Sequence, residues 1–168
     1  MEYKQRKETR LKEYDYSANG AYFVTVCTKD RKHILSTIHV GGGALDAPYI
    51  ELTEKGEIVR EQFEKMNHLY EDINVKHYVI MPNHIHFIIE IAKSGGTSGR
   101  PSPTRSNSIV SKYVGTFKRF TNKISGIELW QRSYYDHIIR NEADYLEKSD
   151  YIINNPAKWA EDEYFTEG

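Results

Sequence analysis

The chain has 168 residues, a net charge of −1 and a single cysteine, Cys27. This length suits one domain with its own core, and one cysteine excludes both a disulfide framework and a cysteine-rich zinc site. The first residues, MEYKQRKETRLKEY, contain no apolar stretch, and the longest apolar runs elsewhere are only as long as strands. We therefore expect an intracellular protein without a signal peptide or a membrane span.

The balanced net charge conceals a segregation of charge along the chain. Residues 92–140 carry nine basic residues against two acidic ones, whereas residues 141–168 carry two basic residues against eight acidic ones. The first thirteen residues are also basic. This pattern favours a face that binds a polyanion, although a set of solvated helix faces explains the charges equally well.

In the first half of the chain, the pattern predicts a strand, a helix and a hairpin. Residues 21–28, AYFVTVCT, are β-branched and aromatic and predict a buried strand. A loop with three glycines follows, and Thr53 then caps a helix that extends to about residue 69. Its core face is predicted from helical spacing to comprise Val59, Phe63, Met66 and Tyr70. Residues 73–81 and 84–91 are two further strands around a Pro-Asn turn.

The second half predicts two helices and one more strand. Residues 92–107 are rich in Gly, Ser and Pro and predict a flexible loop, after which Ser108 starts a helix. The apolar face of this helix is predicted to contain Ile109, Tyr113, Val114, Phe117 and Ile124. Residues 134–139 predict a strand, and Asn141 caps a third helix that ends before Pro156.

This order of elements predicts the fold class. Strands and helices alternate around a central hairpin, which is typical of a ferredoxin-like α+β sandwich: an antiparallel sheet with its helices packed on one face. We expect a single domain over residues 1–168, with a basic N-terminal arm at 1–20 and an acidic tail at 157–168.

Two histidines on the second hairpin strand are the sharpest chemical feature. Residues i and i+2 of a strand point to the same face, so His84 and His86 project together and can clamp a metal ion, while Ile85 faces the core. A pair of surface histidines without a ligand is the alternative. A third ligand must come from elsewhere in the chain.

The third helix offers a tyrosine and an asparagine one turn apart. Tyr151 and Asn155 share a helical face, so a phenol and an amide oxygen could approach one ion. The equivalent position after Tyr145 is Ser149, a weaker ligand. The alternative is that Tyr151 packs and Asn155 caps the helix before Pro156.

Three stretches, taken in order, carry a family resemblance: RLKEYDYSANGAYFVTVCT, HYVIMPNHIHFIIEI and WQRSYYDHIIRNEADYLEKSDYIINNPAKW. The sequence resembles the single-tyrosine HUH transposases, and more closely the REP-associated tyrosine transposases. The resemblance implies a ferredoxin-like fold with the HUH motif, His84 and His86, on a central strand. It also implies Mg²⁺ or Mn²⁺ held by these histidines and by Asn155, and Tyr151 as the nucleophile.

The family implies an enzyme that cuts single-stranded DNA near hairpins or palindromic repeats. A 5′-phosphotyrosine intermediate forms and leaves a 3′-hydroxyl that can rejoin strands, so no nucleotide cofactor is needed. We expect a bacterial, cytoplasmic, nucleoid-associated enzyme, either a monomer or a homodimer. A hairpin-binding protein without cleavage, and a nickase of the replication-initiator or relaxase type, are the alternatives.

The basic residues supply the expected DNA contacts. Those of the second helix could follow the DNA backbone, and those of the N-terminal arm could read the hairpin. Exposed aromatic rings such as Tyr134 and Tyr135 could stack on unpaired bases. The predicted DNA-binding residues are Arg6, Lys7, Arg10, Lys112, Lys118, Arg119, Lys123 and Arg132.

Overall fold

The computed structural model describes residues 20–40, 47–92 and 109–167. An antiparallel sheet of four strands forms its centre, in the order β4-β5-β1-β6. The strands are β1 (Gly20–Cys27), β4 (Ile73–Ile80), β5 (His84–Ile91) and β6 (Tyr135–Ile139). The strand that carries His84 and His86 is therefore an inner strand, as predicted.

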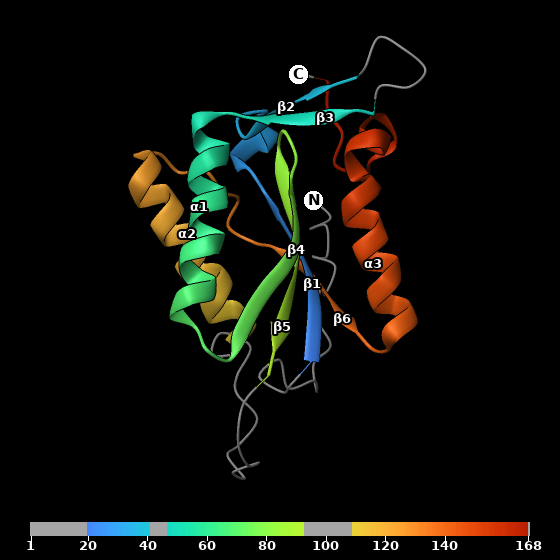
Figure 1. Ribbon diagram of the computed structural model, residues 1–168. Helices are drawn as coiled ribbons and strands as arrows, with labels where there is room; N and C mark the ends of the chain where they lie inside the picture. The colour runs from blue at the N-terminus through green and yellow to red at the C-terminus, as the bar shows by residue number, and fades with distance from the viewer. Residues whose placement is uncertain (1–19, 41–46, 93–108, 168) are drawn as a thin grey trace, which may run out of the picture.

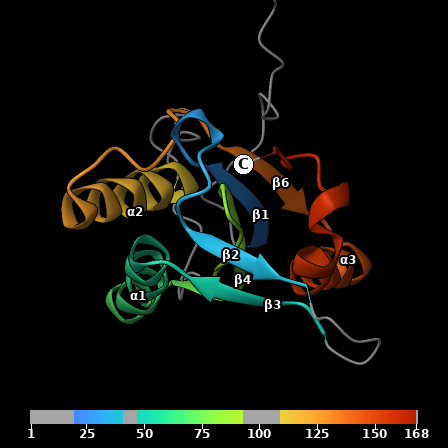
Figure 2. The ribbon, with the colours of Figure 1, turned by 90° about the horizontal axis from the view of Figure 1, so that it is seen from above.

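Helices cover both faces of this sheet (Figures 1 and 2). Helices α1 (Glu54–Leu69) and α2 (Ile109–Ser125) pack together on one face, while α3 (Glu142–Asn154) lies alone on the other. The ferredoxin-like α+β class is confirmed, but the expectation that all helices share one face is corrected. The physical reason is that α3 packs Ile152 against a second apolar cluster, on the far side of the sheet from α1 and α2.

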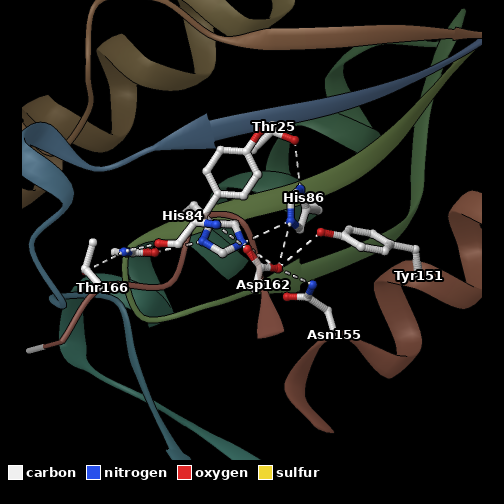
Figure 3. A network of polar contacts seen from close by, with 9 residues as sticks. Thr25, His84, His86, Tyr151, Asn155, Asp162 and Thr166 are labelled. Carbon is white, nitrogen blue, oxygen red and sulfur yellow. Dashed lines mark hydrogen bonds and ion pairs between the residues drawn. The ribbon is translucent and has the colours of Figure 1, made fainter. Parts of the chain in front are cut away.

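The alternation of side chains along the strands divides the interior into two clusters. Ile85, Phe87 and Ile89 of β5 are fully buried and face α1 and α2. Ile88 belongs to the smaller cluster beneath α3, and on a strand it shares its face with His84 and His86. The histidine pair thus lies on the α3 face of the sheet, as Figure 3 also shows.

Capping side chains define the helix starts. The Thr53 hydroxyl accepts a hydrogen bond from the Gly56 N–H at 3.2 Å, and the Asn141 side chain accepts one from Asp144 N–H at 2.9 Å. Helix α3 ends at Asn154, and a 3₁₀ segment, Asn155–Glu161, continues the chain with Pro156 near its start. Both predicted caps and the predicted end of α3 are confirmed.

Several details differ from the sequence-based expectations. The predicted loop after β1 contains a 3₁₀ turn, Lys29–Arg31, and a separate hairpin of β2 (Ser36–His39) and β3 (Tyr49–Leu52). Ile124, predicted to face the core, is 52% exposed because it lies in the last turn of α2. The predicted 92–107 loop and the 1–20 arm fall almost wholly outside the described residues.

The structure also bears on membrane insertion. Within the described ranges, every helix is too short or too polar to cross a bilayer.

Candidate active site

Strand β5 places His84 and His86 side by side on one face of the sheet (Figure 3). Both imidazoles are buried, and their Nε2 atoms lie 3.0 Å apart. The register of β5 against β1 places the pair inside the sheet, because His86 pairs with Thr25 and His84 pairs with Cys27 on that neighbouring inner strand. The predicted clamp is thus a buried pair whose ring nitrogens converge, and not a pair of exposed surface histidines.

A polar side chain orients each imidazole from behind. Nδ1 of His86 is 2.8 Å from the Thr25 hydroxyl, and Nδ1 of His84 is 2.8 Å from Oδ1 of Asn83. The Asn83 amide nitrogen donates to the Tyr164 carbonyl oxygen at 2.9 Å, so its carbonyl oxygen is left to accept the Nδ1 proton of His84. With the proton on Nδ1, the Nε2 lone pair of His84 is available to a ligand. Such outer hydrogen bonds commonly fix the tautomer of metal-binding histidines.

The site keeps both histidines neutral. Burial, followed by the proximity of His86, lowers the pKa of His84 to about 2, and burial also lowers the pKa of His86. A neutral imidazole is the form that binds metals, so no proton must be removed before an ion binds at neutral pH.

A carboxylate that the sequence analysis did not single out completes the site. Asp162 lies just after the 3₁₀ segment, and its side chain has no solvent exposure. Its Oδ2 is 4.0 Å from Nε2 of His84 and 4.0 Å from Nε2 of His86. Its Oδ1 accepts the backbone N–H of Tyr164 at 2.7 Å. Figure 3 shows Asp162 between the histidine pair and the side chains of α3.

The two residues predicted on the third helix both reach this carboxylate. Tyr151 donates its hydroxyl to Oδ2 of Asp162 at 3.1 Å, and Asn155 donates its amide nitrogen to the same oxygen at 2.6 Å. The Tyr151 ring also makes edge contacts with His86, with 5.1 Å between centroids, and with Phe23 at 5.8 Å. The structure therefore brings together all four predicted catalytic and metal residues.

The surroundings of the site lower the pKa of the Asp162 carboxyl and raise the pKa of the Tyr151 phenol. Burial would raise the pKa of Asp162, but His86 and the hydrogen bonds from Asn155 and the Tyr164 backbone hold that pKa well below its usual range. Burial, followed by the negative charge of Asp162, raises the pKa of Tyr151 well above its usual range. The phenol is thus protonated in this arrangement.

Tyr151 is also accessible from outside. The residue is 38% exposed, and it helps to line a hollow of about 300 Å³ beside α3 and the segment that follows it. Glu147, Asp150 and Lys158 contribute to the same hollow. Tyr151 therefore borders solvent on one side and the buried histidine pair on the other.

Tyr145 is held away from the histidines. Its hydroxyl donates to Oε1 of Glu90 at 2.6 Å, and burial, followed by this bond, raises its pKa to about 12. Glu90 lies four residues beyond His86 on β5, which is roughly 13 Å along a strand. The structure thus separates the hydroxyl groups of the two tyrosines of α3.

Those predicted DNA-binding residues that lie on α2 are separated from this site by the sheet. Lys112, Arg119 and Lys123 are exposed on α2, across the sheet from the histidine pair, and Arg132 is exposed in the loop before β6. Lys118 is instead half-buried and donates to the carbonyl oxygens of Gln131 at 2.8 Å and Ser133 at 3.0 Å. Burial lowers its pKa to about 8. Arg6, Lys7 and Arg10 lie outside the described residues.

The donor set fits a divalent cation. His84, His86 and Asp162 offer one ligand atom each, and these atoms lie within 4.8 Å of one another. In addition, Oδ1 of Asn155 is buried without a hydrogen-bond partner among the described residues. Carboxylate and amide oxygens are ligands that suit both Mg²⁺ and Mn²⁺, and imidazole nitrogens are ligands of divalent transition metals.

No family model matches the chain. An uncharacterized protein from Haemophilus influenzae is 32% identical, and the match spans 96% of this chain and 94% of that protein. The REP-associated tyrosine transposase of Escherichia coli is 24% identical, over 85% of this chain and 70% of that protein. The chain therefore belongs to one family with the Haemophilus protein, and it is related to the REP-associated tyrosine transposases.

A solved structure supports the fold. The structure of a REP-associated tyrosine transposase bound to a REP hairpin superposes with a TM-score of 0.58 at 22% identity. The superposition covers 89% of this chain and 74% of the other. The predicted resemblance and the predicted fold class are both confirmed.

Proposed function

We propose that this protein is a transposase-type enzyme that cuts single-stranded DNA near a hairpin and becomes joined through Tyr151 to the 5′ phosphate at the break. One observation carries the proposal: the Tyr151 hydroxyl, the Asn155 amide and the Nε2 atoms of the histidine pair all face one carboxylate oxygen. A nucleophile and a candidate metal site within one small polar cluster suit phosphoryl transfer to a tyrosine.

The residues divide the chemistry between them. The oxygen of Tyr151 attacks the phosphorus, the new bond joins tyrosine to the 5′ phosphate, and the bond from phosphorus to the 3′ oxygen breaks. The phenol loses its proton, and the departing oxygen takes one up to become a 3′-hydroxyl. The reverse attack by a 3′-hydroxyl rejoins strands. His84 and His86, with an oxygen donor from the α3 end of the site, would hold Mg²⁺ or Mn²⁺, which supplies charge neutralisation at the phosphate.

The relatives support the substrate class. The curated relative from Escherichia coli is named a REP-associated tyrosine transposase, and the solved relative has a REP hairpin bound. We extend hairpin DNA to this chain on that basis, together with its basic segments, since backbone charge supplies most nonspecific affinity for nucleic acids.

A covalent-adduct assay tests the nucleophile. Wild-type protein is incubated with Mn²⁺ and a labelled oligonucleotide that carries a hairpin and a single-stranded flank, and products are separated on a denaturing gel. We expect an adduct that Tyr151→Phe loses and Tyr145→Phe keeps, because of these two tyrosines Tyr151 contacts His86, whereas the Tyr145 hydroxyl is bound to Glu90. An adduct that persists in Tyr151→Phe would contradict the assignment.

The histidine pair is tested in the same assay. His84→Ala and His86→Ala should each abolish metal-dependent cleavage and retain most of the hairpin affinity, which comes mainly from charge on other elements. Hairpin binding by the wild type with neither nick nor adduct would instead support the alternative of a binding protein without catalysis.

A further inference from the structure

We propose that Asp162 is the third ligand of the metal site, and that Asn155 positions this carboxylate instead of binding the ion itself. The inference rests on the proposed function only for the presence of a divalent ion at the histidine pair. It assigns a role to a residue beyond the helix that bears the tyrosine, in a segment that the sequence suggested was only an acidic tail.

The three ligand atoms have the spacing that an ion requires. Nε2 of His84 and Nε2 of His86 are 3.0 Å apart, and Oδ2 of Asp162 is 4.0 Å from each of them. The point equidistant from these three atoms is about 2.2 Å from each, close to the roughly 2.0–2.1 Å of Mg²⁺–oxygen bonds. One ion can therefore reach all three atoms with little movement of the side chains.

The orientation of Asn155 argues against this residue as the ligand. Its amide nitrogen points at Oδ2 of Asp162, 2.6 Å away, and so its carbonyl oxygen is turned from that atom. As a donor to the carboxylate, Asn155 fixes the position of Oδ2 opposite the histidines.

The burial of Asp162 also supports its role as a metal ligand. Its side chain has no exposure, yet only one of its oxygens is fixed by the backbone, through the N–H of Tyr164. The other oxygen accepts hydrogen bonds from Tyr151 and Asn155, which carry no charge, and lies 4.0 Å from Nε2 of each histidine. A buried carboxylate is costly unless a positive charge compensates it, and a divalent ion between Asp162 and the histidines supplies that charge.

The test is a measurement of Mn²⁺ affinity, by electron paramagnetic resonance or calorimetry, on the full chain without DNA. We expect Asp162→Asn to bind Mn²⁺ at least tenfold more weakly than the wild type, and Asn155→Ala to lose less than Asp162→Asn. Glu163→Gln is the matched control, because it removes the adjacent, exposed carboxylate and should leave the affinity unchanged.

A second measurement needs no variant and so does not depend on the folding of Asp162→Asn. In ¹³C-labelled wild type, the carboxylate resonance of Asp162 should shift on titration with Mg²⁺, whereas that of Glu163 should stay in place. A stationary Asp162 resonance during saturable Mg²⁺ binding would overturn the proposal.

The outcomes separate the ligand assignment from the proposed strand transfer. Equal or tighter Mn²⁺ binding by Asp162→Asn would mean that the carboxylate merely covers the histidines, and it would overturn the inference. If Asp162→Asn binds Mn²⁺ more weakly but the wild type forms no DNA adduct, the result would support Asp162 as a ligand and contradict the proposed strand transfer. A wild type that binds no Mn²⁺ would overturn the inference.

Discussion

His84 and His86 owe their low pKa values to the place of β5 inside the sheet, where water cannot solvate an imidazolium. In the unfolded chain a histidine takes up a proton near pH 6.5, whereas burial and His86 lower the pKa of His84 in the folded state to about 2. The unfolded state therefore binds more protons below pH 6.5, and the free energy of unfolding falls as the pH falls.

This linkage gives a prediction for stability. Between pH 6.5 and pH 5, His84 should contribute a loss of about 2 kcal/mol in the free energy of unfolding, and the contribution should vanish above pH 6.5. Urea unfolding in EDTA at pH 7.5 and at pH 5.0 measures the difference. His84→Gln removes the titrating group, so its loss over this interval should be smaller. An equal loss in both proteins would contradict the burial argument.

At the scale of single residues, the sequence predicts those site residues whose spacing places them on one face of a strand or helix. The two-residue spacing of the histidines and the one-turn spacing of Tyr151 and Asn155 both follow from regular geometry. Asp162 could not be predicted in this way, because the 3₁₀ segment that precedes it has no periodic pattern. Its signal in the sequence is weak: one acid among three, Glu161 to Glu163, shortly after the NNP that ends α3.

At the scale of elements, backbone hydrogen bonds of Leu35 link the start of helix α1 to the turn that precedes His84. The Leu35 N–H donates to the Pro82 carbonyl oxygen at 3.1 Å, and the Leu35 carbonyl oxygen accepts the Thr53 N–H at 2.9 Å. Gly56, in the first turn of α1, lies against this same carbonyl group: a Cβ there would be 2.1 Å from the Leu35 oxygen. The absence of a side chain at Gly56 is therefore what lets α1 start so close to Leu35.

Two glycine substitutions test this close approach. Gly56→Ala should lower the free energy of unfolding by about 1–3 kcal/mol, because the clash with backbone exceeds the gain in helix propensity. Gly115→Ala is the control within α2, where an added Cβ would have no neighbour within 4 Å, and it should raise stability by about 0.5–1 kcal/mol. Urea midpoints of both variants measure these changes in stability. A stabilising Gly56→Ala would show that the backbone at Leu35 can move away from the added Cβ without cost.

The elements also show why local pattern could not determine the whole arrangement. The four sheet strands and three helices are predictable, because each has its own periodicity, and α1 and α3 also begin at capping residues. The choice of sheet face for α3 is not a local property: it depends on Ile152 meeting the cluster around Phe23 and Ile88. The β2–β3 hairpin was missed because its strands have only four residues each and contain one buried residue, Ser36.

Across the whole molecule, the basic surface of α2 and the candidate active site lie on opposite faces of the sheet. DNA that touches both must pass around an edge of the sheet, so binding and chemistry should be separable. The triple variant Lys112→Gln, Arg119→Gln, Lys123→Gln should weaken hairpin binding and reduce its salt dependence, by a slope of roughly 0.7 to 0.9 for each phosphate that the protein no longer neutralises. Adduct formation at saturating DNA should remain at the wild-type rate, and a large drop would place α2 at the reaction site.

The final prediction concerns which chain supplies each part of the site. In this structure Tyr151 meets the histidines of its own chain, since α3 packs on the sheet that carries His86. The alternative is a homodimer in which the tyrosine helix crosses to the partner. A mixture of His84→Ala and Tyr151→Phe proteins distinguishes the two arrangements: exchanged helices would assemble some sites that contain both intact residues, whereas sites built within one chain never would. We expect no adduct from the mixture on a denaturing gel, at any ratio of the two proteins. An adduct above the level of either variant alone would show that α3 serves the partner's histidines.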